Sequence, residues 1–254
     1  MRAHDIQRNI WSSWQIAPEI LILVAFIAFQ YFRAHGSSRI QRTYFLAGLA
    51  SILAVVITPV GARAMDYFSL HMVQHITLMM ITGPLLVLGT PDSFNPKNTL
   101  FKYATHPVIS WVTYAALMIG VHLPAPHNFI MEHPWTHTYI EVPLYILIPY
   151  LFYFNLLDRK LENRRISPAL SVISLFLMMV PETLTGFSIY VSHGSLYNDM
   201  YSINDQRRGG SLMWSGAMII DTIWLAFAVY HWIKSEELQS KIVDAQIAAE
   251  KNRR

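Results

Sequence analysis

The residues of this chain best suited to binding a metal ion are histidines. His71 and His75 lie four positions apart in the stretch Ser69-Leu70-His71-Met72-Val73-Gln74-His75. Four residues are about one turn, or about 6 Å, of an α-helix, so both imidazoles project from the same helix face. Met79 continues that stripe by one more turn. Two imidazoles at this spacing can bind one ion together, and imidazole with a nearby thioether suits copper.

Further histidines fall near predicted helix ends. His122 closes one apolar segment, His137 precedes another, and His193 follows a third. The candidate metal ligands are therefore His71, His75, His122, His137, His193 and Met79. His4, His127 and His133 are interpreted as isolated polar groups at the membrane interface. The chain has no cysteine, which excludes thiolate metal sites, disulfides and iron–sulfur clusters.

The composition is that of an integral membrane protein, with 53% hydrophobic and 14% charged residues. A transmembrane helix needs about 20 mainly apolar residues. We expect an all-α polytopic fold with seven spans, at residues 16–34, 43–60, 69–90, 107–123, 138–157, 166–191 and 211–233. The membrane domain would cover residues 1–234, and residues 235–254 would form a cytoplasmic helical tail.

The orientation follows from the basic residues in alternate loops. One set of loops holds fourteen Lys and Arg residues and the other holds five. The richer set is expected in the cytoplasm, which places the N-terminus outside and the C-terminus inside. Eight of the eleven histidines then lie at the outer face of a bacterial inner (plasma) membrane, and only His35, His106 and His231 lie inside. The net charge of +3 reflects the inner loops and does not indicate nucleic acid as a partner.

Two acidic residues lie well inside predicted spans, away from their ends. Glu182 follows Pro181 in the sixth span, and Asp221 lies near the middle of the seventh. Each needs a partner or a proton in the membrane, so they form helix–helix hydrogen bonds or handle ions, as in a proton-coupled transporter. Gly83-Pro84 predicts a kink in the third span, below the histidine pair.

Three motifs resemble the seven-helix CtaG family of assembly factors for caa-type cytochrome c oxidases. They are His71-Met72-Val73-Gln74-His75 with the following Gly83-Pro84, then His122-Leu-Pro124 with His137, and Asp205-Gln206-Arg-Arg-Gly209-Gly210-Ser-Leu-Met213-Trp214. The chain departs from the family where two consecutive prolines are usual, at Gly83-Pro84, and where a Glu-His pair is usual, at Glu141-Val142. The resemblance implies an assembly factor that delivers copper to a haem-copper oxidase subunit. A role in ligation carries over only to His71, His75, His122 and His137.

The residues and the resemblance favour a copper metallochaperone of the respiratory chain rather than an enzyme. Copper would bind transiently and pass by ligand exchange to the docked oxidase subunit, a step that requires no turnover. The alternatives are a haem-binding electron-transfer protein and a proton-coupled transporter that uses Glu182 and Asp221. His71 and His75 share one helix face, so they cannot be the two axial ligands of one haem.

Overall fold

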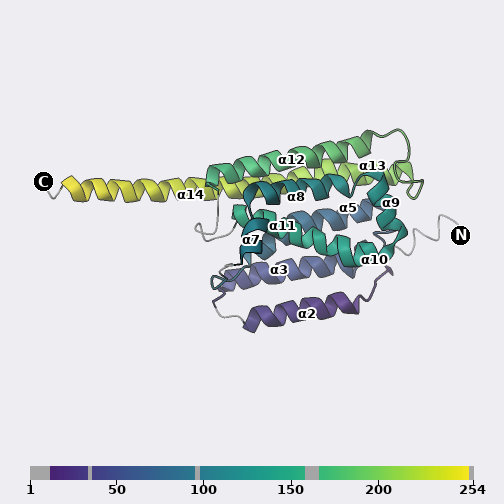
Figure 1. Cartoon of the computed structure of the whole chain (residues 1–254), viewed down its shortest axis with the longest axis horizontal. Helices are drawn as coiled ribbons and strands as arrows, with labels where there is room; N and C mark the ends of the chain where they lie inside the picture. The colour runs from purple at the N-terminus through teal and green to yellow at the C-terminus, as the bar shows by residue number, and fades with distance from the viewer. Residues whose placement is uncertain (1–11, 34–35, 95–97, 158–165, 252–254) are drawn as a thin grey trace.

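The computed structural model describes residues 12–33, 36–94, 98–157 and 166–251, and within these ranges it contains helices and no β-strand (Figure 1). The predicted all-α fold is therefore confirmed. His4, His35 and the four basic residues between 159 and 165 lie outside the described residues. The helical elements, including the π-helical segments η2, η3 and η5, are α2 (Pro18–Arg33), α3 (Arg39–Val56), α4 (Pro59–Ala62), α5 (Phe68–Ile76), η2 (Thr77–Thr82), α6 (Gly83–Leu88), α7 (Thr99–Ala104), α8 (Pro107–Gly120), α9 (Pro124–Glu132), α10 (Pro134–Thr136), η3 (His137–Glu141), α11 (Val142–Leu157), α12 (Pro168–Val191), α13 (Ile203–Ser211), η5 (Leu212–Gly216) and α14 (Ala217–Lys251).

Five continuous helices of the described chain are long and apolar enough to cross a membrane. They are Arg39–Ala62, Phe68–Leu88, Pro134–Leu157, Pro168–Val191 and Ile203–Lys251. The pair α8 and α9 makes a sixth if the two are one broken span, bent by 73°. The first predicted span coincides with α2, which has 16 residues and lies beside α3 (Figure 1). The structure thus supports five or six spans by length and composition, where the sequence predicted seven.

The connection between the fourth and fifth predicted spans is helical rather than a loop. After the turn at His122, Pro124 begins α9, and Pro134 begins α10. Proline favours the first turn of a helix because its missing N–H would have no partner there. The 73° bend turns α9 across the end of the bundle, and this brings His127 into the interior, where it is fully buried.

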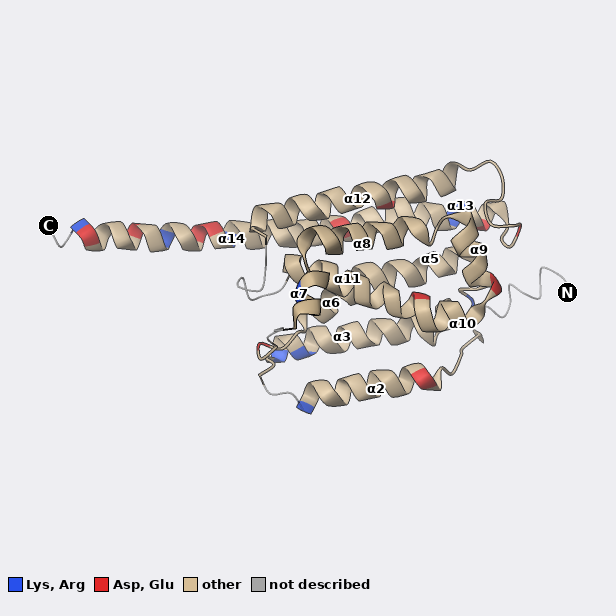
Figure 2. Cartoon of the chain, in the orientation of Figure 1, with Lys and Arg blue, Asp and Glu red and all other residues tan. Residues whose placement is uncertain are grey.

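The last helix continues past the predicted boundary at Ser235. α14 is one helix from Ala217 to Lys251, so the tail is helical, as the sequence suggested, and continuous with the membrane domain. Its final turns project from the bundle and carry charges of both signs, whereas the bundle itself carries few (Figures 1 and 2). Leu238 and Ile242, which lie one turn apart on this tail, are 60% and 50% exposed.

The helix that contains Gly83-Pro84 is not interrupted there, but it becomes a wider π-helix just before this pair. The π-helical segment η2 ends directly before Gly83, and the span remains continuous from Phe68 to Leu88. Proline at position 84 cannot donate to the Met80 carbonyl one turn earlier. That carbonyl accepts a hydrogen bond from Trp224 Nε1 on α14 instead, at 2.7 Å. A similar π-helical segment, η3, ends just before Val142-Pro143 and carries His137 and Glu141.

The start of α5 is held by α13. Asp205 accepts hydrogen bonds from the backbone N–H of Phe68 at 2.6 Å and from the Ser69 hydroxyl at 2.5 Å. A carboxylate at a helix N-terminus satisfies free N–H groups and favours the helix dipole. Gly209 lies against the Phe68 ring, where an added Cβ would come within 2.3 Å of a ring carbon. The Asp205–Trp214 motif therefore fixes the helix that carries His71 and His75.

Candidate metal centre

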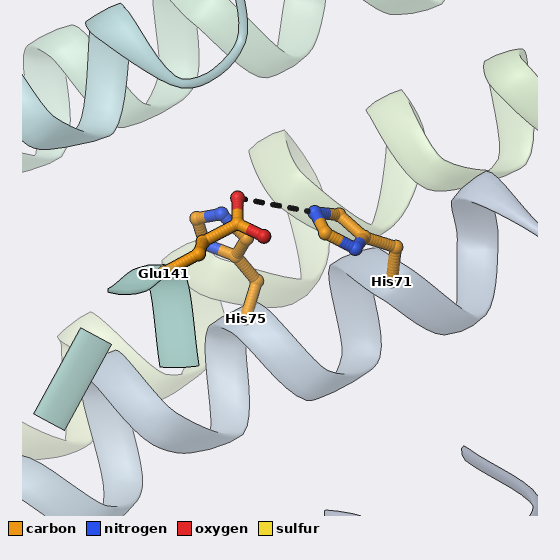
Figure 3. A group of neighbouring side chains, drawn as sticks. All are labelled: His71, His75 and Glu141. Carbon is orange, nitrogen blue, oxygen red and sulfur yellow. Dashed lines mark ion pairs between the residues drawn. The ribbon is translucent and has the colours of Figure 1, made fainter. Parts of the chain in front are cut away.

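A buried group of side chains that could hold a metal ion lies between α5 and η3. His71 and His75 come from α5 and Glu141 comes from η3, and Figure 3 shows the three side chains directed toward one another. One donor atom from each residue lies within 4.8 Å of the other two. The three residues are 1%, 2% and 2% exposed. Bonds of about 2 Å to a tetrahedral ion place donor atoms roughly 3.4 Å apart, so small side-chain movements would complete a three-ligand site.

The Glu141 carboxylate is held from several sides. His137 Nδ1 donates to Oε2 at 2.6 Å, and the Tyr145 hydroxyl donates to Oε1. His71 Nε2 lies 3.7 Å from the same Oε1. Hydrogen bonds of this kind orient a metal-binding carboxylate and limit its rotation. Glu141 is therefore positioned to face His71 and His75.

Three further imidazoles surround this group. The ring centroid of His75 lies 4.8 Å from that of His122, and the centroid of His71 lies 5.4 Å from that of His127 and 5.3 Å from that of His137. These three residues come from the turn after α8, from α9 and from η3. We call His71, His75, His122, His127 and His137 the histidine cluster. All five are buried, at 6% exposure or less.

Several ring nitrogens of the cluster have no hydrogen-bond partner among the described residues. They are both nitrogens of His71, Nε2 of His75, Nε2 of His122 and Nδ1 of His127. His122 Nδ1 lies 2.5 Å from the Met118 carbonyl, which can only accept, so the proton is on Nδ1 and Nε2 presents a lone pair. A buried polar atom without a partner costs about 1–3 kcal/mol. These ring nitrogens therefore cost free energy in the folded protein, and a bound ion would reduce that cost.

Two tyrosines from the segment before α13 cover the cluster. The Tyr197 hydroxyl donates to the His122 carbonyl at 3.1 Å, and the Tyr201 hydroxyl lies 3.2 Å from His127 Nε2. Burial raises the pKa of both phenols, so the hydroxyl groups keep their protons. A Tyr201 hydroxyl that donates to His127 Nε2 would leave the proton of that ring on Nδ1, whereas the opposite arrangement would free Nδ1 for an ion. The hydrogen bond thus couples His127 to the covering segment.

The structure brings together four of the six predicted ligands. His71, His75, His122 and His137 belong to the cluster. Met79 lies in η2, fully buried in the hydrophobic core. His193 is exposed on the segment after α12 and is not part of the cluster.

Two members of the site were missed as ligands. His127 was interpreted as an isolated interfacial group, but the bend before α9 buries it beside His71. Glu141 was noted only as a departure from a family pattern. Its spacing of four residues from His137 was the available signal, since that spacing allows the hydrogen bond that the structure contains.

A second buried polar group lies apart from the histidines. The carboxyl groups of Glu182 on α12 and Asp221 on α14 face each other, and the Tyr114 hydroxyl on α8 donates to Glu182 Oε1 at 3.0 Å. The remaining oxygens Glu182 Oε2 and Asp221 Oδ2 have no hydrogen-bond partner among the described residues. The Tyr114–Glu182 hydrogen bond joins α8 and α12, which matches the expectation of a helix–helix hydrogen bond for Glu182 and leaves the ion-handling interpretation untested.

The fold and the site define a polytopic helical protein of membrane type with a buried histidine and carboxylate centre. Residues 24–235 match the family described as cytochrome c oxidase caa3 assembly factor (Caa3_CtaG). The chain belongs to this family, as its motifs suggested.

Similar proteins occur in mycobacteria. An uncharacterized protein of Mycobacterium leprae (strain TN) is 21% identical over 225 residues, which are 76% of this chain and 34% of that protein. An uncharacterized protein of Mycobacterium tuberculosis (strain CDC 1551 / Oshkosh) is 22% identical over 224 residues, with the same two coverages. The chain thus spans about a third of the length of these curated relatives. No solved structure matches the chain significantly.

Proposed function

We propose that this protein binds copper in the histidine cluster and transfers it to a subunit of a haem-copper cytochrome c oxidase during assembly. The observation that carries the proposal is the set of buried, unpartnered imidazole nitrogens around the fixed carboxylate of Glu141. Imidazole and carboxylate donors suit several transition metals. Membership of an oxidase assembly family favours copper among them.

The transfer needs no covalent chemistry. His71, His75 and Glu141 would hold the ion, and His122, His127 and His137 are close enough to replace a ligand as the ion leaves. Exchange of one imidazole for another keeps the coordination nearly constant at each step. The protein would then act as a carrier and not as an enzyme. This transfer does not require Met79 or His193 as a ligand.

The proposed topology has seven spans, with α2 as the first. α2 lies beside α3 and exposes large apolar side chains, including Ile22, Phe26 and Phe29, as a lipid-facing helix does. With the basic loops in the cytoplasm of a bacterium, the histidine cluster lies at the outer face of the plasma membrane. The oxidase partner would dock there, and the C-terminal tail would lie inside.

A haem-binding role is the less favoured alternative. Two axial histidines need the macrocycle between their rings. Here the rings of His75 and His122 and those of His71 and His75 pack directly against each other, with centroids 4.8 and 5.5 Å apart.

The test is the copper content of protein purified without added metal. We expect about one copper per chain, a marked loss in both His71→Ala and His75→Ala, and a double variant that loses much less than the sum of the two, because ligands of one ion are coupled. His106, exposed at the start of α8, provides the matched control, and His106→Ala should keep its copper. Equal copper in the wild type and both single variants, or tightly bound haem in the absorbance spectrum, would contradict the proposal.

A further inference from the structure

A pocket of about 230 Å³ lies beside the histidine cluster, at the end of the bundle where α2 begins. Its walls come from the segment at the start of α2, from α4, from α5 and from η3. Gln15 fixes one wall, because its backbone N–H donates to the Ile57 carbonyl at 3.0 Å. His137 lines the pocket and also donates through Nδ1 to Glu141. The His137 ring therefore contacts both the pocket and the buried site.

The pocket contains donor groups that suit a soft cation. Met65 contributes a thioether, His137 an imidazole and Glu19 an exposed carboxylate. Gln74, which is 2% exposed, also lines it. The Gln74 amide donates to the Val55 carbonyl at 2.9 Å, whereas its Oε1 has no partner among the described residues. Thioether and imidazole together favour the cuprous ion.

A second opening reaches the cluster at His122, but its chemistry differs. This groove between α8 and α12 has a volume of about 620 Å³ and is lined mainly by apolar side chains, among them Ile119, Val180 and Leu184. Those three are 41%, 46% and 62% exposed, as lipid-facing residues are. An ion that leaves water needs replacement ligands at each step, and only the pocket at His137 offers a series of them.

We propose that this pocket is the entrance for copper, in which Met65 and His137 bind a cuprous ion before it passes to Glu141, His71 and His75. The inference rests on the proposed function, since it concerns how the same site is loaded. His137 would release the ion inward because its ring contacts both the pocket and the Glu141 carboxylate. Copper then reaches the cluster from the outer aqueous face without crossing the apolar groove.

The first test compares two substitutions that add bulk in the two openings. Ala62→Trp narrows the pocket and Leu184→Trp narrows the groove, and neither changes a proposed ligand. Cu(I) is supplied to the purified protein as its bicinchoninate complex, and uptake is followed by the loss of the complex's colour. Ala62→Trp should slow uptake about tenfold or more, because each about 1.4 kcal/mol of added barrier is a factor of ten in rate. The final copper stoichiometry should stay unchanged, and Leu184→Trp should load at the wild-type rate. Unchanged loading in Ala62→Trp, or slowing only in Leu184→Trp, would overturn the entrance.

A second test does not depend on copper. The chain has no cysteine, so Met65→Cys provides a single thiol. A membrane-impermeant maleimide should label this thiol in folded, metal-free protein, and adding Ala62→Trp should suppress the labelling. A thiol that stays unlabelled until the protein unfolds would show that water does not reach the pocket and would refute the inference. A labelled thiol in Met65→Cys, combined with a wild-type protein that takes up no copper, would instead refute the proposed function, and with it the role of the pocket in loading.

Discussion

Replacing Glu141 with Gln removes the one negative charge of the candidate centre while keeping the size of the side chain. The distance of 3.7 Å between Glu141 Oε1 and His71 Nε2 sets the scale for the attraction between the Glu141 carboxylate and a cation bound beside it. Two unit charges at that separation attract by about 4 kcal/mol at an effective dielectric constant of about 20. Hydrogen bonds from His137 and Tyr145 already neutralise part of the carboxylate charge. The substitution should therefore remove about 1.4 to 2.8 kcal/mol of copper-binding free energy. We expect copper affinity to fall by about 10- to 100-fold, which is also the range for substitutions around metal ligands.

The assay is competition for Cu(I) with a chelator of known affinity, read on wild type, Glu141→Gln and a matched control. Glu182→Gln is that control, because Glu182 is also a buried glutamate that accepts a hydrogen bond from a tyrosine, and it lies outside the histidine cluster. Its copper affinity should equal that of the wild type. An unchanged affinity in Glu141→Gln, or an equal loss in both variants, would refute the assignment of this carboxylate to the metal site.

Three further outcomes follow from the structure. Gly209→Val should destabilise the protein by about 1–3 kcal/mol and lower its copper content, because the new side chain meets the Phe68 ring at the start of α5. Gly216→Ala is the control, because its added methyl group meets only Leu212 at 4.0 Å, and it should change neither property. Equal thermal stability of the two variants would count against the role of α13. Truncation at Ser235 should leave copper binding and oxidase assembly intact, since the tail projects from the bundle, and lost assembly at normal protein level would reveal a partner site on the tail. Reporter fusions after Lys160 and at the C-terminus should report a cytoplasmic location, and a periplasmic signal at either point would break the proposed topology.

The sequence predicted those features of the structure that depend only on the geometry within one helix. The spacing of His71 and His75 fixes them on one helix face, and the structure has both on α5 with a centroid separation of 5.5 Å. The apolar runs located most of the main helices to within a few residues, but the last helix runs from Ile203 to Lys251, well beyond the predicted 211–233. These features follow from helix periodicity and the thickness of the membrane, which neighbouring elements change little.

The structure differs from the sequence-based expectation where tertiary geometry decides. His127 and His193 look alike in sequence, as polar residues after an apolar run. The 73° bend between α8 and α9 buries the first, while the second stays exposed after α12. The spacing of Glu141 from His137 does not show that Glu141 lies beside His71 and His75, because that depends on how η3 faces α5. No periodicity within one helix carries that information.

Two of the three family motifs, at His71–His75 and at Asp205–Trp214, form one structural unit. Asp205 holds the backbone of Phe68 and the side chain of Ser69, three and two residues before His71, and so fixes the start of α5. Gly209 admits the Phe68 ring, and an added Cβ there would also meet Met72 at 3.1 Å. A shift of α5 by even one ångström would move His71 and His75 relative to Glu141, which its own hydrogen bonds hold in place. A distant motif without a proposed ligand is thus required for the geometry of the site, because metal ligands on one helix can meet a carboxylate on another only when both helices are fixed.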